Sequence, residues 1–404
     1  KKWIGNFDKY SLTKALSLTF KKNGIMKFGT KTIHAGVEPD SATGAIMTPI
    51  YQTSTYVQEA VGEHKGYEYS RTSNPTRNAL EKSLAALENG SFGACFGSGL
   101  AAIDCAMKLL SPGDEVITTA DIYGGSYRLF TSVFAKYGIV FHFVDFQNLE
   151  TVQQHLNANT KMVWVETPSN PMMNIVDLQG LANILQGKGI LLAVDNTFAT
   201  PYLQRPLELG ADIVMHSATK YLGGHSDVVM GTLITRSEVV ANEIYRIQNS
   251  TGAICGPQDA FLVLRGLKTL HLRMARHCEN GAKIAHWLRD QNKVAEVFWP
   301  GFDNHPNHLV AKQQMSGFGG MISFSLKENT IAAANAVCSK TQLFSLAESL
   351  GGVESLIGHP AQMTHAAVPK AEREKIGVVD SLIRLSIGVE DVEDLILDLE
   401  QALK

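Results

Sequence analysis

The sequence predicts an α/β fold in which a parallel sheet is covered by helices on both faces, followed by a smaller α+β module. Two observations support this prediction. From about residue 85, short apolar stretches rich in β-forming residues alternate with helix-like stretches. Such an alternation is typical of a parallel sheet with helices on both faces. The chain of 404 residues is also long enough for two or three domains.

The expected strands of the main sheet are short and apolar. They lie at residues 115–119, 139–146, 161–166, 190–196, 212–217 and 230–235. Helix-like stretches, such as residues 126–136 and 177–186, separate most of them. Because ligands of such sheets bind beyond the carboxyl ends of the strands, the loops after these strands are the first candidates for a site.

The pattern changes in the C-terminal part of the chain. A long helical pattern covers residues 257–291, strands are expected at 321–326 and 381–387, and an amphipathic helix is expected at 392–402. At the other end, residues 1–25 carry six lysines and a single acid, which predicts a basic arm or leader. We therefore expect four segments: 1–25, 26–84, a large domain at 85–285 and a smaller α+β domain at 286–404.

The composition excludes several classes of protein. With 36 Lys and Arg against 39 Asp and Glu, the net charge of −3 argues against a nucleic-acid-binding protein. A hydrophobic content of 45% argues against disorder, and no apolar run approaches the ~20 residues of a membrane span. The five cysteines are scattered without CxxC spacing, which favours a reducing compartment and hence a cytoplasmic location.

A glycine-rich turn precedes an apolar helical pattern near residue 99. Gly97 and Gly99 allow backbone N–H groups to approach an anion, Ser98 adds a hydroxyl, and a helix N-terminus attracts phosphate. The spacing of Gly97, Gly99 and Ala102 also fits the dinucleotide-binding fingerprint. A phosphate site and a nicotinamide-dependent dehydrogenase are both compatible with this turn.

Asp195 and Tyr123 follow two other expected strands. Asp195 ends an apolar strand, where a carboxylate is costly unless a metal, a protonated nitrogen or a hydrogen-bond network is its partner. Tyr123 lies beside two glycines, where its ring is able to stack on a flat cofactor.

Lys220 is the candidate nucleophile. It follows a buried strand and precedes a glycine pair, and partial burial lowers the pKa of a lysine enough for Schiff-base chemistry. Ser217 and Thr219 alternate with it and are placed to donate to one phosphate. The neighbouring acid and histidines offer an alternative metal site at His216, His225 and Asp227. Their spacing is unlike the known zinc patterns, so we expect no metal.

Together these segments offer a phosphate cradle, a stacking ring, a carboxylate for a ring nitrogen and an amine for an aldehyde. Those are the requirements of pyridoxal phosphate (PLP), in which a carboxylate on the pyridinium nitrogen keeps the ring an electron sink. The sequence therefore predicts a PLP-dependent enzyme.

Longer motifs carry a resemblance to a known family. They are Tyr67-Glu68-Tyr69-Ser70-Arg71 with Asn74-Pro75-Thr76-Arg77, Ser98-Gly99-Leu100-Ala101, Tyr123-Gly124-Gly125, Glu166-Thr167-Pro168-Ser169-Asn170-Pro171, Asp195-Asn196-Thr197, Ser217-Ala218-Thr219-Lys220-Tyr221, Ala347-Glu348-Ser349-Leu350-Gly351-Gly352, Met363-Thr364-His365 and Ile383-Arg384-Leu385-Ser386. From about Phe28 to Lys404 the chain resembles the cystathionine γ-lyase and γ-synthase branch of the Cys/Met-metabolism PLP enzymes. This resemblance implies the PLP-dependent transferase fold type I, aspartate-aminotransferase-like, with a mostly parallel seven-stranded sheet and a smaller C-terminal α+β domain.

The resemblance also implies roles for individual residues. Lys220 would form the Schiff base and shuttle protons, Tyr123 would stack on the ring and act as acid or base, and Asp195 would pair with the pyridinium nitrogen. The other expected cofactor-binding residues are Ser98, Gly99, Leu100, Thr197, Ser217 and Thr219, with Tyr69 and Arg71 reaching the phosphate of the neighbouring subunit. The expected substrate-binding residues are Arg384 for the α-carboxylate, Asn170 and Ser349 beside it, and Glu348 for a distal amino group.

The shared phosphate site implies a homo-oligomer, in which residues 26–84 contact the neighbouring subunit. We expect a tetramer built from two active dimers.

The expected reaction is γ-elimination, which cleaves L-cystathionine to L-cysteine, 2-oxobutanoate and ammonia. Glu348 before Ser349 is typical of the γ-acting enzymes, whereas β-lyases tend to differ there, and Gly125 stands where methionine γ-lyases usually carry a cysteine. The same residues serve γ-replacement, so a cystathionine γ-synthase acting on an O-acyl-L-homoserine remains the main alternative. A relative that binds the cofactor without turnover is a further alternative.

Overall fold

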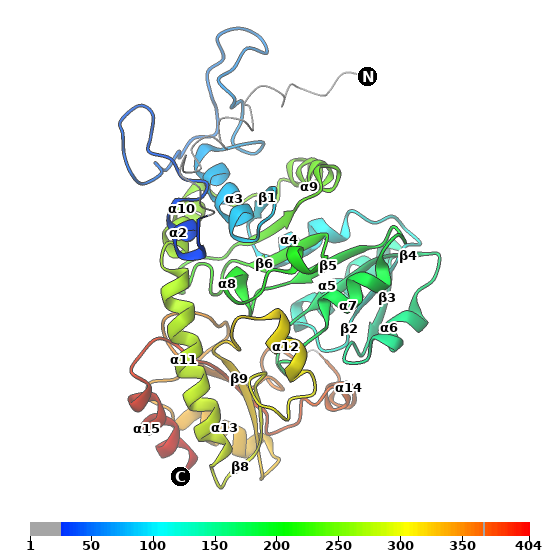
Figure 1. The fold of residues 1–404 in the computed structure, drawn as a ribbon, viewed down its shortest axis with the longest axis vertical. Coiled ribbons are helices and arrows are strands. Elements are labelled where there is room, and N and C mark those ends of the chain that lie inside the picture. Colours follow the sequence, from blue (N-terminus) through cyan, green and yellow to red (C-terminus); the bar gives the residue numbers. More distant parts are fainter. Residues whose placement is uncertain (1–25, 367) are drawn as a thin grey trace.

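The computed structural model describes residues 26–366 and 368–404, so the expected basic arm at 1–25 lies outside the described residues. Two sheets organise the chain (Figure 1). The larger sheet has seven strands: β1 (Phe92–Phe96), β2 (Glu115–Thr119), β3 (Val140–Val144), β4 (Thr160–Glu166), β5 (Leu191–Asp195), β6 (Ile213–Ser217) and β7 (Gly231–Thr235). Their order is β1-β7-β6-β5-β4-β2-β3. β7 runs antiparallel to both of its neighbours, β1 and β6, and the other neighbouring strands pair in parallel.

All six strands expected in this sheet are present, with ends that differ by no more than two residues. The edge strand β1 was not predicted, because its sequence FGACF mixes a glycine and small residues and gives no strand pattern.

Helices cover both faces of the larger sheet. They are α4 (Gly99–Met107), α5 (Gly124–Ser132), α6 (Leu149–His155), α7 (Leu178–Leu185), the short α8 (Thr200–Leu203), α9 (Glu238–Thr251) and the 3₁₀ turns η2 (Phe134–Tyr137) and η3 (Pro206–Leu209). In β4, Trp164 packs in a cluster with α4, α5 and α9, while Val163 and Val165 pack with α6 and α7. Successive side chains of a strand point to opposite faces, so this alternation confirms a sheet buried on both sides.

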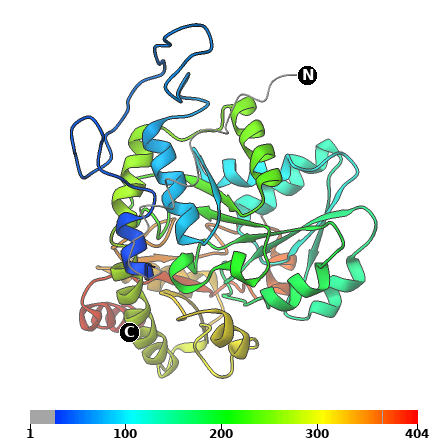
Figure 2. The ribbon, with the colours of Figure 1, turned by 45° about the horizontal axis from the view of Figure 1, so that its top comes forward.

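The N-terminal part contributes α2 (Phe28–His34) and α3 (Pro75–Leu87). Between them the chain loops outward from the body of the molecule (Figures 1 and 2). This segment exposes large apolar side chains, among them Ile46, Val57 and Val61.

The C-terminal part begins with α10 (Pro257–Leu267) and α11 (Leu270–Arg289), which the sequence pattern had joined into one helix. A second sheet follows, with strands β8 (Val294–Phe298), β9 (Met321–Leu326), β10 (Ser345–Leu346), β11 (Leu356–Gly358) and β12 (Ile383–Ser386) in the order β10-β11-β12-β9-β8. The remaining helices are α12 (His308–Gln314), α13 (Ile331–Lys340), α14 (Lys370–Lys375) and α15 (Val392–Leu403). The predicted strands at 321–326 and 381–387 and the last helix are confirmed, whereas β8, β10 and β11 were not predicted.

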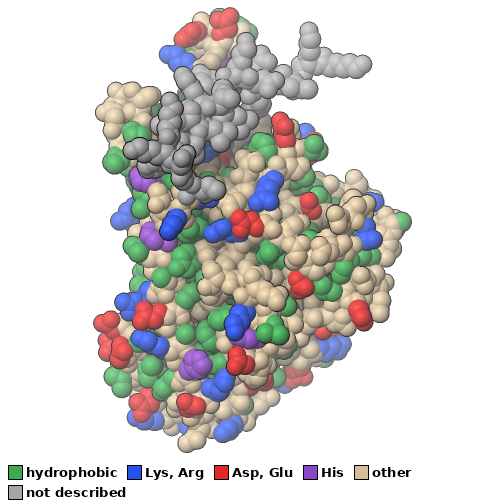
Figure 3. All heavy atoms as spheres, in the orientation of Figure 1, with side chains coloured by type: hydrophobic (Ala, Val, Ile, Leu, Met, Phe, Trp, Pro, Cys, Tyr) green, Lys and Arg blue, Asp and Glu red, His purple; other side chains and the backbone are tan. Residues whose placement is uncertain are grey.

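The surface agrees with the nearly balanced charge. Figure 3 shows basic and acidic side chains interspersed over the face in view. Among the described residues, the search for a helix with the length and apolarity of a membrane span found none.

Candidate active site

The candidate residues lie mainly beyond the carboxyl ends of the strands in the larger sheet. Ser98 follows β1, Tyr123 follows β2, Asp195 is the last residue of β5 and Lys220 follows β6. The second sheet supplies Ser349, after β10, and Arg384, within β12, and both contact residues of the larger domain.

Lys220 is tied to the second domain by a single hydrogen bond. Its Nζ donates to Ser349 Oγ at 2.7 Å. Burial lowers the pKa of Lys220 to about 8, and the nearby Arg384 charge acts in the same direction, while Glu348 opposes both. A substantial fraction of the Lys220 amine is therefore neutral at mildly alkaline pH, which is the form that acts as a base or nucleophile.

Arg384 is a buried cation anchored on uncharged groups. Its Nη1 donates to Asn170 Oδ1 at 2.8 Å and its Nη2 donates to the Ser349 carbonyl at 3.0 Å. Burial lowers the pKa of Arg384 to about 10, so the guanidinium remains charged at neutral pH. No carboxylate among the described residues forms an ion pair with it, which suits Arg384 to a carboxylate from outside the chain.

Ser349 connects the lysine and the arginine. Its hydroxyl accepts from Lys220 and its carbonyl accepts from Arg384. Its backbone has a φ of +89°, a conformation that residues other than glycine rarely adopt and that costs roughly 1–3 kcal/mol. Such strain persists where surrounding contacts impose it, and here the contacts are those to the two candidate site residues.

Glu166 orders the site but was given no role in the sequence analysis. It ends β4, opposite Asp195 of β5. Its Oε2 accepts the backbone N–H of Tyr123 at 2.8 Å, and its Oε1 accepts that of Asn170 at 3.0 Å. Burial and the neighbouring Asp195 raise the pKa of Glu166 well above its usual range. The rule that singled out Asp195, an acid at the end of an apolar strand, would also have found Glu166.

Asp195 has one oxygen occupied and one free. Its Oδ1 accepts from the backbone N–H of Thr197 at 3.0 Å and from Thr197 Oγ1 at 2.5 Å. Its Oδ2 has no hydrogen bond within the described part of the chain. Thr197 Oγ1 in turn accepts the backbone N–H of Ser217 at 2.9 Å, which joins the loops after β5 and β6. Burial raises the pKa of Asp195, so a protonated ring nitrogen is the kind of partner that this carboxylate favours.

The turn before α4 forms a close-fitting cradle. Ser98 caps the helix, and its Oγ accepts the N–H of Ala101 at 3.1 Å. Gly99 begins α4 and lies against Ser217, so a Cβ added at Gly99 would come within 3.0 Å of both Cβ and Oγ of Ser217. Backbone N–H groups at a helix N-terminus beside a hydroxyl suit a phosphate, so these residues fit the phosphate group of PLP.

Replacement of Gly99 by alanine is expected to weaken PLP binding by about tenfold, because the added methyl group overpacks the space between Gly99 and Ser217. Titration of the cofactor-free protein with PLP, followed by absorbance, measures the effect. Gly256→Ala is the control, since a Cβ there would meet only Asp259 Oδ2, at 3.5 Å. An unchanged PLP affinity in Gly99→Ala would contradict the location of the cradle.

Three of the predicted cofactor-binding residues have other contacts within this chain. The Thr219 hydroxyl donates to the Met230 carbonyl at 3.2 Å and accepts the Met230 N–H at 3.0 Å, and its role toward a phosphate stays a prediction. Tyr69 and Arg71 do not join the site of their own chain. Arg71 lies 5.5 Å from the centre of the Tyr69 ring, and its Nη1 donates to the Asn249 carbonyl at 2.8 Å. Their role toward a neighbouring subunit stays a prediction.

Tyr123 and Glu348 lie at the exposed side of the site. Tyr123 is 38% exposed, and burial of the rest of the side chain, together with the nearby Glu348 carboxylate, raises the pKa of its phenol. Glu348 is exposed and lines a small pocket together with Met363, Thr364 and Arg384.

The residues of the alternative metal site are engaged elsewhere. His216 Nε2 lies 2.6 Å from Glu88 Oε1, and His225 Nδ1 lies 2.9 Å from the Gly223 carbonyl. Over residues 26–366 and 368–404, no three His, Cys, Asp or Glu side chains lie together in a way that could hold a metal ion.

Comparison with known proteins gives relatives over nearly the whole chain. The chain is 53% identical to a cystathionine β-lyase of Coxiella burnetii, over 96% of this chain and 100% of the relative. It is 51% identical to a cystathionine γ-lyase of Bacillus subtilis, over 94% and 100% of the two chains. It is 50% identical to a cystathionine γ-synthase of Mycobacterium bovis, over 94% and 97%.

Solved structures give the same result. The fold matches metB from Corynebacterium glutamicum with a TM-score of 0.91 and 49% identity, over 94% of this chain and 98% of that one. It matches a cystathionine γ-lyase of Lactobacillus plantarum, complexed with L-serine, with a TM-score of 0.91 and 46% identity, over 93% and 98%. The architecture is that of the PLP-dependent enzymes of fold type I. The family model for Cys/Met metabolism PLP-dependent enzymes matches residues 29–404, and the chain belongs to that family.

Proposed function

We propose that the protein cleaves L-cystathionine by γ-elimination, taking up water and releasing L-cysteine, 2-oxobutanoate and ammonia. The observation that carries the proposal is the placement of the Lys220 amine, with its lowered pKa, on Ser349, the residue that also accepts from Arg384. A base thus lies next to an anchor for the substrate α-carboxylate. Family membership makes PLP the cofactor and small amino acids the substrates.

Arg384 would bind the α-carboxylate through its planar fork, while Asn170 keeps the guanidinium in place. Held in this way, the substrate would present its Cα–H bond to Lys220. Lys220 Nζ would take the proton from Cα and, in γ-elimination, assist removal of a second proton from Cβ before the sulfur at Cγ departs. When bound, PLP supplies the electron sink that stabilises the charge left at Cα.

Tyr123 and Glu348 would act on the distal half of the substrate. The pKa of Tyr123 lies above the ordinary value of 10.0, so its phenol is protonated at neutral pH and would donate its proton to the departing sulfur. The exposed Glu348 carboxylate, beside the pocket that it lines with Arg384, would bind the distal ammonium group of cystathionine. Water excluded by the bound substrate would strengthen both interactions.

Two other reactions have specific support. The relatives of about 50% identity include proteins named cystathionine γ-synthase and β-lyase as well as γ-lyase. γ-Synthase chemistry would use the same Lys220 and Arg384, with the cysteine sulfur replacing the acyloxy group at Cγ, which leaves as a carboxylate. β-Elimination would need only the first proton removal and, with uptake of water, would release homocysteine, pyruvate and ammonia.

One set of assays separates the three reactions. With L-cystathionine alone, γ-elimination yields 2-oxobutanoate, whereas β-elimination yields pyruvate. With an O-acyl-L-homoserine and L-cysteine, synthase activity yields cystathionine. We expect 2-oxobutanoate from cystathionine to form at the highest kcat/KM. Dominant pyruvate release or dominant cystathionine synthesis would overturn the proposal in favour of the corresponding alternative.

We further propose a cytoplasmic homo-oligomer, a tetramer of two active dimers in which residues 26–84 contact the neighbouring subunit. The free cysteines suit a reducing compartment, and the exposed apolar side chains of the outward loop suit burial against a second copy. Sedimentation at assay concentration tests the assembly. A fully active monomer would contradict it.

The attachment of PLP to the cofactor-free protein is expected to speed up as pH rises and to level off above about 8. Only the neutral amine of Lys220 attacks an aldehyde, and burial lowers its pKa to about 8, so the neutral form gains population through that range. Stopped-flow absorbance at a series of pH values gives the midpoint. In Glu348→Gln the midpoint moves to lower pH, since the Glu348 carboxylate raises the pKa of Lys220. A midpoint near the ordinary value of 10.5 would contradict the burial of Lys220.

A further inference from the structure

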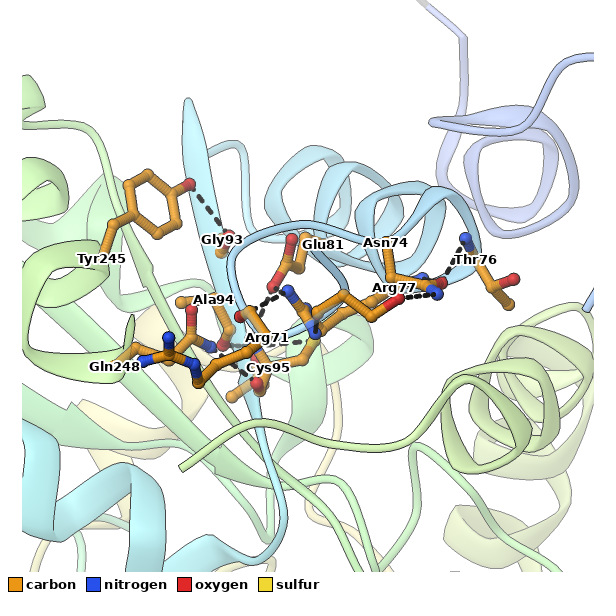
Figure 4. A network of polar contacts seen from close by, with 12 residues as sticks. Arg71, Asn74, Thr76, Arg77, Glu81, Gly93, Ala94, Cys95, Tyr245 and Gln248 are labelled. Carbon is orange, nitrogen blue, oxygen red and sulfur yellow. Dashed lines mark hydrogen bonds and ion pairs between the residues drawn. The ribbon is translucent and has the colours of Figure 1, made fainter. Parts of the chain in front are cut away.

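Arg77 lies in a second polar network, apart from Lys220. It is in the first turn of α3 and is only 2% exposed. Its two terminal nitrogens donate to consecutive backbone carbonyls, Nη1 to Ser70 at 2.8 Å and Nη2 to Arg71 at 3.2 Å. Figure 4 shows this guanidinium between the 70–71 backbone and Glu81. The buried Arg77 therefore fixes the backbone of the exposed segment at residues 70–71.

Glu81 links Arg77 to the larger sheet. Its Oε1 lies 3.6 Å from Arg77 Nε and accepts the backbone N–H of Cys95, in β1, at 3.0 Å. On the same strand, Gln248 of α9 donates to the Cys95 carbonyl at 2.7 Å. Figure 4 shows Glu81 between Arg77 and Cys95. Glu81 therefore ties Arg77 to β1, the strand that precedes the Ser98–Gly99 cradle.

Arg77 binds the backbone at residues 70–71 and not the side chains of Tyr69 and Arg71. Tyr69 is 45% exposed, and the Arg71 guanidinium lies over its ring. Asn74, which caps α3, donates to the Tyr51 carbonyl at 2.8 Å and so holds a second segment of the outward loop. An exposed Tyr–Arg pair on a backbone fixed from inside is an arrangement suited to contact another molecule.

Buried ion pairs contribute little net stability, because desolvation offsets most of the attraction. A gain in stability is therefore a weak explanation for the Arg77–Glu81 pair. Arginine holds two carbonyls at once through its planar fork, whereas a lysine offers a single rotatable ammonium group. The geometry matches a requirement for one fixed backbone conformation at residues 70–71.

We propose that Arg77, braced by Glu81, is a positioning residue that sets the Tyr69–Arg71 segment for the cofactor phosphate of the neighbouring subunit. The inference rests on the proposed homo-oligomer and on the predicted role of Tyr69 and Arg71 at the phosphate of the neighbouring subunit. Arg77 thereby acts in trans: its replacement impairs the site that contains the partner's lysine and spares the site of its own chain. We expect Arg77→Lys to weaken PLP binding by on the order of tenfold in the homo-oligomer, while kcat at saturating PLP changes little.

Mixed oligomers test this directly. Subunits carrying Arg77→Lys and subunits carrying Lys220→Ala are co-expressed with different tags, and oligomers with both tags are isolated. Sites that keep Lys220 and receive the segment from a Lys220→Ala subunit should bind PLP with wild-type affinity. The homo-oligomer of Arg77→Lys and that of Lys220→Ala should both lack sites with wild-type PLP affinity. Arg246→Lys, an exposed arginine paired with Glu243, is the matched control and should leave PLP binding unchanged.

The outcomes separate this inference from the proposed function. The same mixing is done with Arg71→Ala in place of Arg77→Lys. If Arg71→Ala is rescued and Arg77→Lys is not, Arg77 does not position the segment in trans and the inference fails alone. If Arg71→Ala is not rescued, the shared site itself fails. Should Arg77→Lys not fold, Glu81→Gln keeps the arginine and is expected to show a smaller loss of PLP affinity with the same rescue; unchanged PLP affinity there would overturn the inference.

Discussion

Replacement of Lys220 by alanine lowers kcat for cystathionine cleavage by at least about 10³-fold, the largest effect that we expect. The variant removes both the amine that attaches the cofactor and the base beside the substrate Cα. No other described lysine shares its contacts, since Lys220 Nζ alone donates to Ser349 Oγ. Steady-state release of 2-oxobutanoate measures the loss, and the absorbance of the protein reports whether PLP is still held.

The control for this variant is Lys188→Ala, which removes an exposed lysine in the loop after α7. It is expected to keep wild-type kcat and wild-type absorbance. Circular dichroism and thermal unfolding of both variants exclude misfolding as the cause. Turnover by Lys220→Ala within about tenfold of the wild-type rate would contradict the role of Lys220 as base.

Replacement of Arg384 by lysine lowers kcat/KM by about 10²-fold. Charge-assisted hydrogen bonds contribute about 1.5–3 kcal/mol each, and about 1.4 kcal/mol corresponds to tenfold. The positive charge survives in the variant, but the fork that donates to Asn170 and Ser349 is lost, and with it the fixed orientation for an α-carboxylate. Initial rates over a range of cystathionine concentrations give KM and kcat separately.

Arg276→Lys is the matched control for Arg384→Lys, because Arg276 lies on α11 with a half-exposed side chain, 4.0 Å from Glu279. We expect it to keep both constants. PLP binding should persist in Arg384→Lys, since Arg384 contacts the substrate side of the site. Unchanged kcat/KM in Arg384→Lys would place the carboxylate anchor elsewhere.

The sheet could be predicted from the sequence where local pattern and tertiary structure agree. Each of the six predicted strands is an apolar run between polar loops. By contrast, β1 pairs at the edge of the sheet through small residues, and Gly93 packs so closely on α3 that a Cβ would lie 2.5 Å from the Glu81 carbonyl. Tertiary contact rather than strand propensity makes this segment a strand.

The break between α10 and α11 could not be predicted from the sequence either, because it too depends on tertiary contacts. Both helices share one apolar periodicity, and no proline stands between them. In the first turn of α11, Arg273 donates to the carbonyl of Gly266 in α10 and to the carbonyl of Tyr221, which is far away in the sequence. Local periodicity reports the buried face of each helix and carries no information about such a contact.

The candidate site divides in the same way. Lys220 and Asp195 could be singled out from the sequence, because each is a charged residue at or just after the end of an apolar strand. Other features of the site depend on contacts between distant segments. Ser349 has a positive φ and bridges Lys220 and Arg384. Thr219 bonds to Met230. Sequence patterns therefore predicted which groups are present, while the structure supplies how they are oriented.

The most direct test of the account is to locate the cofactor on the chain. The purified protein is treated with borohydride to fix bound PLP, digested and mapped by mass spectrometry. We predict a single phosphopyridoxyl modification on the peptide that contains Lys220, absent from Lys220→Ala and retained in Lys188→Ala. Modification of a different lysine, or none after incubation with PLP, would contradict the assignment of Lys220 and the mechanism built on it.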